Sequence, residues 1–542
     1  MPRSKSPTPG EETGLRRRGN GGNGTKAARR GKSASFDSAA SLDSAASIDP
    51  ASTQRTPRHP KLSWFSAFTT YLGYAVLTVF GHVRDFFGKK TGLSRYSRYL
   101  SPSAKLAPLC ASWENFYTRR LYHRIQDCWN RPITGPPGAK ILVIKRETND
   151  NNKSMQMLPG RPTSECLNLG SYNYLGFADD WQETCRDDVV GAVETYGCSS
   201  ASARGDMGTT ALHKELEVVV AKFVGKPDAV VFNMGYGTNA STIPALMGRG
   251  SLIVSDSLNH TSIVNGARAS GATVRVFKHN DASSLEQVLR TQIAKGQPRT
   301  RRRWTKILVM VEGIYSMEGE ICNLREVVAV AKKYKCYIYV DEAHSIGALG
   351  DTGRGVCEHE GVDPADVDIL MGTFTKSFGG MGGYIASSKQ FCDYLRANAS
   401  GLVYSEALSP VVCQQVLTAF KIIDGQLHKG VGRRKLRAVR ENSNFFRDGL
   451  EKIGCEVFGD YDSPVIPMML YNPGKIPAFT RECYKRGLAV VVVGFPATPL
   501  VESRARFCIS AGHERADLEE ALRKIEEVCT LLKLRYRKSP FG

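Results

Sequence analysis

The sequence predicts an α/β protein whose sheet is mostly parallel. Short apolar runs rich in β-branched residues, typical of buried strands, alternate with segments of helical period. The runs are Ala229–Phe232, Leu252–Val254, Val274–Phe277, Ile307–Val311, Tyr337–Val340 and Ala489–Val493. The helical segments include Leu212–Phe223, Ser284–Ile293 and Leu324–Tyr334. This alternation predicts a sheet that is covered by helices on both faces.

The composition excludes several classes of protein. A hydrophobic share of 42% excludes wholesale disorder, and 52 Gly among 542 residues exclude a coiled coil or a collagen-like chain. The 14 Cys contain no Cys-x-x-Cys pair, so we expect no zinc site or other metal site, and isolated thiols fit a reducing compartment. The net charge of +20 leaves nucleic acid, an anionic membrane and an acidic substrate open as partners.

The N-terminal part of the chain divides into two segments. Residues 1–61 carry 12 Lys and Arg against 5 acidic residues and are rich in Ser, Gly and Ala, so we expect a disordered basic arm. Residues 62–90 begin with 22 uncharged residues, Leu62–Val83, flanked by Lys and Arg. We expect a membrane-associated helix there, either spanning the bilayer or lying in its interface, with a buried core helix as the alternative.

Three further parts follow. Residues 91–165 form an N-terminal segment, residues 166–422 contain the predicted sheet, and residues 423–542 form a smaller C-terminal domain that ends in a helix over Arg515–Leu534.

Polar side chains follow the predicted strands at the edge where an open α/β sheet binds its ligand. Three of the apolar runs given above, and a fourth at Val367–Met371, are each followed by residues that can bind or react. These residues are Gly235 and Tyr236, His260, Asp341 and His344, and Thr373, Thr375 and Lys376.

Pyridoxal 5′-phosphate explains this set of residues. Its aldehyde bonds to a lysine, here Lys376, and a carboxylate, here Asp341, pairs with its ring nitrogen. A flat side chain such as His260 stacks on the ring. Backbone and hydroxyl groups near a helix start bind the phosphate, and these would be Gly235 and Tyr236 together with Thr373 and Thr375.

A nucleic-acid-dependent ATPase is the competing interpretation of Asp341-Glu342-Ala343-His344 in so basic a chain. That function needs a phosphate loop, GxxxxGK[ST]. The one GK[ST] sequence is Gly31-Lys32-Ser33, and Lys26 stands where the first glycine of the loop is required. The sequence therefore predicts no nucleic-acid partner.

Long motifs extend this interpretation, and they resemble the α-oxoamine synthase family of pyridoxal-phosphate enzymes over about 480 residues. They include ENFYTRRLYHRIQDCWNRPI, NLGSYNYLGF, LVMVEGIYSMEGEI, YVDEAHSIGALGDTGRGV, DILMGTFTKSFGG and VVVVGFPATPLVESRARFCISAGH. The resemblance implies a fold-type I, aspartate-aminotransferase-like architecture with a large cofactor-binding domain and a smaller C-terminal α+β domain.

The resemblance also implies an acyl transfer: condensation of L-serine with palmitoyl-CoA, with release of CO₂ and CoA, to give 3-ketodihydrosphingosine, the first step of sphingolipid synthesis. Lys376 would also remove the Cα proton, and His344 would bond the ring hydroxyl. Tyr172 and Asn173 would line the substrate site. Bacterial relatives place a carboxylate-binding Arg where this chain has Gly494, so Arg506 is the expected serine carboxylate ligand.

In this family the site lies at a dimer interface, which implies a heterodimer with a non-catalytic chain of the same fold and leaves room for small activating or regulatory membrane subunits. Ser405 would lie in the loop that faces the partner. The implied location is the endoplasmic reticulum membrane, with the catalytic domain in the cytosol. Two alternatives stay open: another synthase of the family, such as a 5-aminolevulinate synthase, and a non-catalytic regulatory subunit of the same fold. The basic loop Arg299–Trp304 is either a solvated turn or a contact for CoA phosphates or lipid headgroups.

Overall fold

The computed structural model of the chain describes residues 64–91, 122–150, 152, 154–495 and 497–537. The predicted arm of residues 1–61 lies outside this part, and so do residues 92–121 of the predicted N-terminal segment. All of the described residues belong to one compact unit, Pro57–Gly542.

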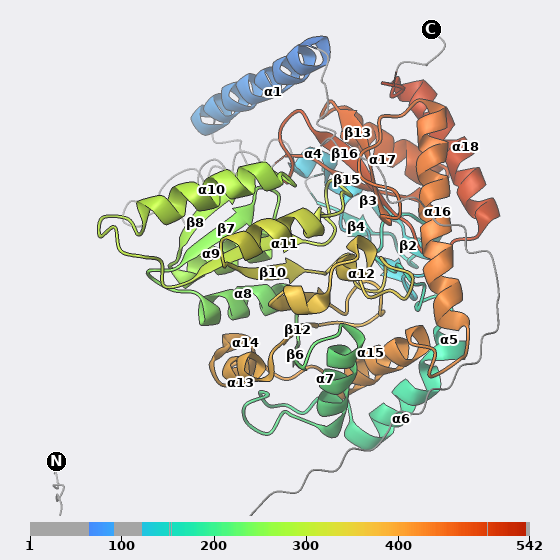
Figure 1. Cartoon of the computed structure of the whole chain (residues 1–542). Coiled ribbons are helices and arrows are strands. Elements are labelled where there is room, and N and C mark those ends of the chain that lie inside the picture. The colour runs from blue at the N-terminus through green and yellow to red at the C-terminus, as the bar shows by residue number, and fades with distance from the viewer. Residues whose placement is uncertain (1–63, 92–121, 151, 153, 496, 538–542) are drawn as a thin grey trace, which may run out of the picture. The chain divides into compact units, whose positions relative to one another are not determined.

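A seven-stranded sheet forms the centre of the large domain (Figure 1). Its strand order is β6-β12-β11-β10-β9-β7-β8, and all strands except β12 run parallel. The strands are β6 (Asp228–Phe232), β7 (Leu252–Asp256), β8 (Thr273–Phe277), β9 (Ile307–Glu312), β10 (Tyr337–Asp341), β11 (Ile369–Thr373) and β12 (Gly383–Ser387). The mostly parallel sheet is therefore confirmed, and five of the six predicted apolar runs are strands in it.

Helices cover both faces of this sheet. Alternate strand residues point to opposite sides, so strands that are apolar throughout present an apolar surface on each face. Val230 and Phe232 of β6 pack in one apolar cluster, and Ala229 and Val231 pack in the other. The first cluster includes side chains of α8 (Gly235–Leu246), α9 (Thr261–Ser270) and α13 (Lys389–Asn398). The second includes side chains of α7 (Ala211–Phe223), α10 (Ala282–Lys295), α11 (Leu324–Lys333) and α15 (Pro410–Ile423). Each fully buried Val, Leu, Ile or Phe contributes about 1.5–3 kcal/mol, so both layers hold the strand ends in place.

The run Ala489–Val493 is not one strand, and this prediction was wrong. Residues Leu488–Ala489 form β14, which pairs in parallel with β5 (Thr163–Asn168), whereas Val491–Val493 form β15, antiparallel to β16 (Ser503–Cys508). The run thus passes from one sheet to another. An unbroken apolar run carries no alternation that would reveal such a break.

The C-terminal domain has its own sheet and its own core. The sheet has the order β13-β16-β15, with β13 at Val465–Tyr471, and its core includes side chains of three helices. These helices are α16 (Val431–Ile453), α17 (Lys475–Lys485) and α18 (Arg515–Leu532). A further sheet, β1-β2-β5-β14, joins this domain to strands β1 (Ile133–Thr134) and β2 (Lys140–Ile144) across the predicted boundary at residue 165.

The remaining elements are short and connect these layers. They are α4 (His123–Ile125), α5 (Trp181–Thr184), α6 (Arg186–Tyr196), α12 (Val356–Glu360), α14 (Ser400–Val403), the 3₁₀ turns η2 (Gln126–Cys128) and η3 (Pro364–Asp366), and the pair β3 (Arg146–Glu147) and β4 (Gln156–Met157).

The predicted apolar segment forms helix α1, Trp64–Lys90. Large apolar side chains that are exposed recur along it every three to four residues and so share one stripe. They are Trp64, Phe68, Tyr71, Leu72, Val76, Val79, Phe80, Val83, Phe86 and Phe87. Among the helices in the described ranges, none is both long and apolar enough to cross a bilayer.

Candidate active site

The carboxyl ends of the parallel strands enclose a cavity of about 210 Å³. All eight residues predicted to bind the cofactor line it, together with further residues of the same strand ends and helix starts. The lining includes Gly235, Tyr236, Asn239, His260, Ser262, Glu312, Asp341, His344, Thr373, Thr375 and Lys376. As expected from their places at strand ends, residues separated by more than 100 positions in the chain meet in one cavity.

Asp341 lies at the floor of this cavity and is held on both carboxylate oxygens. Asn239 donates its amide N–H to one oxygen at 2.7 Å, and the backbone N–H of Ala343 donates to the other at 2.9 Å. Asn239 is itself fixed, because it accepts a hydrogen bond from the Tyr339 hydroxyl at 2.6 Å. A buried carboxylate that is held in this way can face one cationic N–H of a ligand without reorganising.

His260 is the N-cap residue of α9, and its Nδ1 accepts the backbone N–H of Ser262 at 3.2 Å. Its own backbone N–H donates to the carboxylate of Glu312. Burial lowers the pKa of His260, so the ring is neutral and can lie against a flat ligand. Burial, and then the charge of Asp341, raises the pKa of Glu312 well above its ordinary value, and the side chain of Glu312 positions His260 by accepting its backbone N–H.

The opposite end of the cavity is suited to a phosphate. Gly235 is the first residue of the 12-residue helix α8, whose first backbone N–H groups have no partner within the helix. A Cβ at Gly235 would lie 2.6 Å from Thr373 Oγ1, so only glycine fits there. The hydroxyls of Thr373 and Thr375 lie 2.8 Å apart beside it. Tyr236 is partly exposed, and its hydroxyl accepts a hydrogen bond from Asn265.

Lys376 follows strand β11 and lines two cavities. Burial lowers its pKa to about 8, against the opposing effect of Asp341 and Glu312, so about a quarter of the amine is uncharged at pH 7.5. An uncharged lysine is the form that attacks a carbonyl or accepts a proton.

The second of these cavities measures about 870 Å³ and is lined by Tyr172 and Asn173, the predicted substrate residues. The Tyr172 ring lies 5.7 Å from Lys376 Nζ. Asn173 lines the cavity with its side chain fixed, because its amide N–H donates to Asp179 at 3.0 Å and its side-chain carbonyl accepts the Ala178 N–H at 3.4 Å. Asn173 thus shapes the wall of the cavity, while Tyr172 faces the amine.

His344 and Arg506 complete the region around Tyr172. The Tyr174 hydroxyl lies 2.8 Å from His344 Nδ1, and burial keeps the pKa of His344 well below its ordinary value. Arg506, on β16, lies with its guanidinium 4.9 Å from the Tyr172 ring centroid. Its contacts with the Ser316 carbonyl, at 3.5 Å, and with the Met317 sulfur, at 3.7 Å, are weak, and its buried Nε has no hydrogen-bond partner among the described residues.

Arg506 is therefore a buried cation without an acidic partner in the described ranges. Arg504, two residues earlier on the same strand, is paired with Glu318 at 3.4 Å and Glu502 at 3.0 Å. A buried charge without a partner is costly, and a carboxylate ligand would remove that cost. The structure thus leaves Arg506 free to bind an anion.

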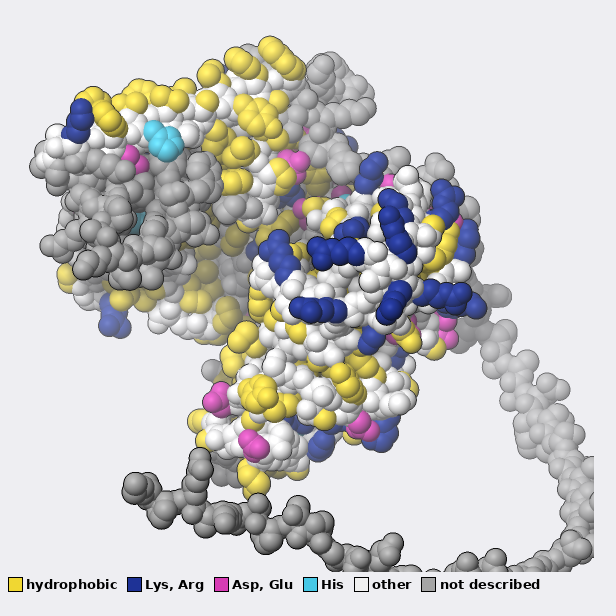
Figure 2. Space-filling model, turned by 90° about the vertical axis from the view of Figure 1, so that its left-hand side faces the viewer, with side chains coloured by type: hydrophobic (Ala, Val, Ile, Leu, Met, Phe, Trp, Pro, Cys, Tyr) yellow, Lys and Arg dark blue, Asp and Glu magenta, His cyan; other side chains and the backbone are white. Residues whose placement is uncertain are grey.

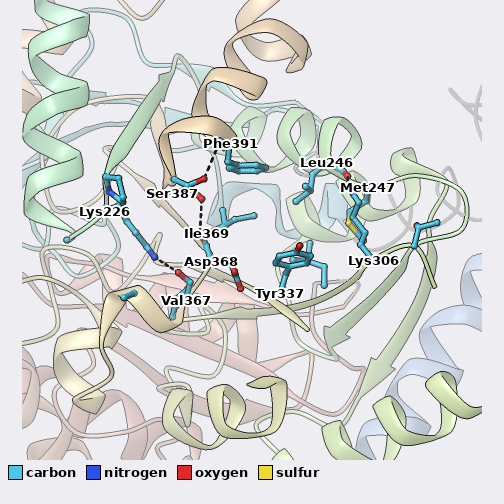
Figure 3. A pocket seen from close by; sticks show the side chains of 16 residues that line it. Lys226, Leu246, Met247, Lys306, Tyr337, Val367, Asp368, Ile369, Ser387 and Phe391 are labelled. Carbon is cyan, nitrogen blue, oxygen red and sulfur yellow. Dashed lines mark hydrogen bonds between the residues drawn. The ribbon is translucent and has the colours of Figure 1, made fainter. Parts of the chain in front are cut away.

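A third cavity, of about 630 Å³, lies at the opposite edge of the sheet, where β9, β10 and β11 begin (Figure 3). None of the predicted site residues lines it. Its two lysines already bond to backbone carbonyls: Lys226 to Pro364 and Val367, and Lys306 to Leu246 at 2.7 Å. This cavity has no arrangement of groups suited to catalysis.

The 210 Å³ cavity fits pyridoxal phosphate. It combines an amine with a lowered pKa, a fixed carboxylate, a neutral imidazole and a helix start beside two hydroxyls. Lys376 would hold the aldehyde carbon, Asp341 the ring nitrogen, His344 the ring hydroxyl, and Gly235 with Thr373 and Thr375 the phosphate.

Three residues of the site were not found from the sequence: Asn239, Ser262 and Glu312. Glu312 follows the run Ile307–Val311 directly, so the same strand-end argument applied to this run would have found it. Asn239 stands one helical turn after Gly235 and faces the same side. The sequence has no comparable signal for Ser262, because a serine near a helix start usually caps the helix.

The chain matches the family model described as aminotransferase class I and II over residues 164–525. It is 57% identical over 482 residues to long chain base biosynthesis protein 2d of Oryza sativa, a match that covers 88% of this chain and 96% of the relative. It is 56% identical over 475 residues to long chain base biosynthesis protein 2a of Arabidopsis thaliana, with the same coverage. It is also 48% identical over 471 residues to human serine palmitoyltransferase 3, covering 86% of this chain and 85% of that protein.

Solved structures agree. The serine palmitoyltransferase of Sphingomonas wittichii superimposes with a TM-score of 0.67 at 28% identity, covering 80% of this chain and 99% of that one. A high-resolution structure of SPT with PLP superimposes with a TM-score of 0.68 at 25% identity, covering 81% of this chain and all of the other.

Proposed function

This chain belongs to the serine palmitoyltransferase family of pyridoxal-phosphate-dependent acyltransferases, and from that premise we propose that it is the catalytic subunit, which condenses L-serine with palmitoyl-CoA and releases CO₂ and CoA. The product would be 3-ketodihydrosphingosine, the first intermediate of sphingolipid synthesis. One observation carries the proposal: Lys376 lies where a cofactor-sized cavity meets a larger one. The reacting amine thus faces both the cofactor and the space that an acyl thioester would enter.

The residues of the site divide the work between binding and proton transfer. Bound pyridoxal phosphate supplies an electron sink for the pair left at Cα when a bond there breaks. Arg506 holds the serine carboxylate, and His260 and Tyr172 flank the substrate. Lys376, uncharged in about a quarter of molecules at pH 7.5, would accept the Cα proton, and the fixed carboxylate of Asp341 would stabilise positive charge at the ring nitrogen.

The alternatives from the same family make different predictions. A 5-aminolevulinate synthase would use glycine and a short acyl-CoA, and a regulatory subunit would lack the lysine that this chain has at residue 376. The identity of 48–57% to long-chain-base and serine palmitoyltransferase proteins favours serine and a long acyl chain.

The test is product analysis with the full-length chain co-expressed with a non-catalytic partner. We expect a long-chain ketone product from L-serine with C16 acyl-CoA, and much less from glycine with succinyl-CoA. The matched control is Lys376→Arg, which keeps the charge and most of the volume but attacks carbonyls poorly, and which should abolish turnover. Product from glycine and succinyl-CoA alone would replace this proposal by the aminolevulinate reaction.

We also propose a heterodimer in which the partner completes the phosphate end of the cavity. Exposed apolar side chains surround that end, with Met207 87% and Tyr404 83% exposed, beside Met234, Tyr236 and Met381. The loops that carry them are joined, since Asn233 donates to the Glu406 carbonyl at 2.7 Å and Ala203 pairs with Glu406 in a β-bridge. Ser405, the predicted partner-facing residue, is half-buried between Tyr404 and Glu406. Such exposed apolar groups around a site are typical of an interface.

Membrane attachment through α1 is the last part of the proposal. The exposed apolar stripe of α1 has the pattern of a helix that lies in a membrane interface. Reaction with a long-chain acyl-CoA and release of a long-chain ketone also favour a membrane surface. The proposed location is the cytosolic face of the endoplasmic reticulum. The test is to compare the localisation of the tagged full-length chain with that of a variant without residues 62–90.

A further inference from the structure

One face of the large domain carries a dense group of cations. Residues 249–303 contain ten Lys and Arg, and the side chains of all ten are exposed. We call this group the basic face. It comprises Arg249, Arg268, Arg275, Lys278, Arg290, Lys295, Arg299, Arg301, Arg302 and Arg303. Figure 2 shows Lys and Arg side chains gathered over the part of the large domain turned toward the viewer.

The acidic residues of the same segment do not neutralise this face. There are three of them, and each is already engaged. Asp256 is buried against His279, Asp281 caps α10 through the backbone N–H of Ser284, and Glu286 pairs with Lys333 at 2.6 Å. None of the ten cations forms an ion pair with another described residue. The face thus holds a concentrated positive charge that no ion pair with a described residue offsets.

The loop after α10 presents the densest part of the basic face in a fixed shape. The Gln297 backbone N–H donates to the Arg302 carbonyl at 2.8 Å, and its side chain donates to the Arg303 carbonyl. The indole N–H of Trp304 donates to the Gln292 carbonyl at 2.9 Å and so holds the loop against α10.

Two arginines of this loop have an unusual backbone conformation. Arg299 and Arg301 have φ values of 66° and 57°, in the left-handed region that side chains rarely adopt. Four arginines in five residues also repel one another. A loop that keeps an ordered conformation despite this backbone strain and this charge repulsion is typical of a binding element.

The other loops of this edge continue the same surface. The Thr305 backbone N–H donates to the Gly250 carbonyl at 3.0 Å, which joins the arginine loop to Arg249. Arg275 lies on β8, the edge strand of the sheet. Between the cations, Val276 and Ile293 expose apolar side chains.

We propose that the basic face binds the headgroups of an anionic phospholipid bilayer, a second membrane contact in addition to α1. A broad surface of cations interspersed with aliphatic side chains suits a membrane interface, where the cations meet phosphates and the aliphatic groups enter the headgroup layer. Single-stranded nucleic acid is disfavoured, because it needs aromatic side chains that stack on bases, and Trp304 is committed to α10. The proposal depends on membrane attachment but not on the acyl transfer.

The test compares two quadruple variants of the full-length heterodimer. The loop variant replaces Arg299, Arg301, Arg302 and Arg303 by Gln. The control variant replaces Lys429, Arg433, Arg434 and Arg437 by Gln, which removes the same charge from four exposed positions before and within α16. Binding is measured by flotation with vesicles of phosphatidylcholine and with vesicles that contain 30% phosphatidylserine.

We expect the wild-type protein to prefer the anionic vesicles and the loop variant to lose at least tenfold of that preference, since each Lys or Arg near an anionic surface contributes about fivefold. The control variant should keep the preference within about twofold, and high salt should abolish it. Hydrogen exchange should show protection of residues 297–304 on the anionic vesicles only.

Three results would overturn the proposal. Equal losses in the two variants would show an effect of net charge alone, and an absent anionic preference in the wild type would exclude lipid binding by this face. Protection of residues 297–304 by the partner subunit in lipid-free detergent would instead make the face a protein interface. Activity in detergent reports the proposed function, and binding to neutral vesicles reports the membrane contact of α1. Both should be the same in the two variants, so a failure of the basic-face proposal is distinguishable from a failure of the proposed function.

Discussion

Lys376 shows how the position of a residue changes its chemistry. An exposed lysine with a pKa near 10.4 is uncharged in about 0.1% of molecules at pH 7.5, whereas a pKa of about 8 gives about a quarter. We therefore predict that the covalent uptake of pyridoxal phosphate by the apoprotein rises with pH to a midpoint near pH 8 and then levels off. Stopped-flow absorbance with borohydride trapping measures this rate.

Asp341→Asn provides the control for this prediction. The charge of Asp341 raises the pKa of Lys376 and so opposes the effect of burial. Its removal should move the midpoint below pH 8. A rate that continues to rise beyond pH 9 in the wild type would mean that Lys376 behaves as an exposed amine.

Arg506 is the residue for which the structure adds most to the sequence. Its guanidinium is buried, contacts neutral atoms weakly and lies beside Tyr172. A hydrogen bond to a charged group contributes about 1.5–3 kcal/mol, so Arg506→Ala should raise the KM for serine by roughly tenfold to a hundredfold. The KM for palmitoyl-CoA should change little, and steady-state kinetics with each substrate varied in turn measures both.

Arg504 is the matched control, because it lies on the same strand and is equally buried but is paired with Glu318 and Glu502. Arg504→Ala should lower the thermal stability, since it leaves two carboxylates without their partner, and should leave the serine KM unchanged. If the serine KM responded to Arg504 and not to Arg506, the carboxylate ligand would have been assigned to the wrong arginine.

At the scale of elements, the strand ends carry the site, and this is why so much of it was predictable. Apolar runs identify β6, β7, β10 and β11, and the parallel arrangement brings the residues after them to one edge. Arg506 was different: it lies within β16 of another sheet and was reached only through a family resemblance. The break of Ala489–Val493 between two sheets was not predictable, because tertiary pairing and not residue type decides where that run turns.

A buried ion triad joins the ends of β7 and β8. His279 Nδ1 lies 2.9 Å from the Asp256 carboxylate, and its Nε2 lies 3.2 Å from Glu320. Burial alone would lower the pKa of His279, but the two carboxylates outweigh it and raise the pKa to about 10. The folded state thus binds a proton that the unfolded chain releases near pH 6.5.

We predict from this triad a loss of stability on the alkaline side. The folded-state pKa is the higher one, so the stabilisation is complete below about pH 6.5 and decreases as the pH rises toward 10. Urea unfolding between pH 6 and 10 should show a decline of the free energy of unfolding that His279→Gln largely removes, while that variant is destabilised by several kcal/mol at pH 6.5 because buried Asp256 and half-buried Glu320 lose their cation. A parallel decline in the variant would assign the alkaline effect to other groups.

At the scale of the whole molecule, the chain presents a site whose phosphate end is bordered by exposed apolar side chains. The sequence predicted the two-domain enzyme and its cofactor cavity, since both follow from local patterns. It did not reveal which loops lie around the cavity mouth, because residues 203–208, 233–236 and 400–406 meet only in the folded chain. This surface is where we expect the partner subunit.

The proposed interface leads to a prediction about assembly. Tyr404→Glu places a charge at an 83% exposed aromatic position, so it should leave the fold intact and weaken the association of the two subunits by at least tenfold, because a charge would then be buried without a partner. The holoenzyme should also lose pyridoxal phosphate faster on dilution, since the phosphate end of the cavity would open to solvent.

Tyr337→Glu is the control: Tyr337 is also an exposed tyrosine, 55% exposed, but it lies at the third cavity on the opposite edge of the sheet. Analytical ultracentrifugation and cofactor release should change for Tyr404→Glu alone, and a heterodimer that is unaffected by Tyr404→Glu would place the partner on another face of the molecule.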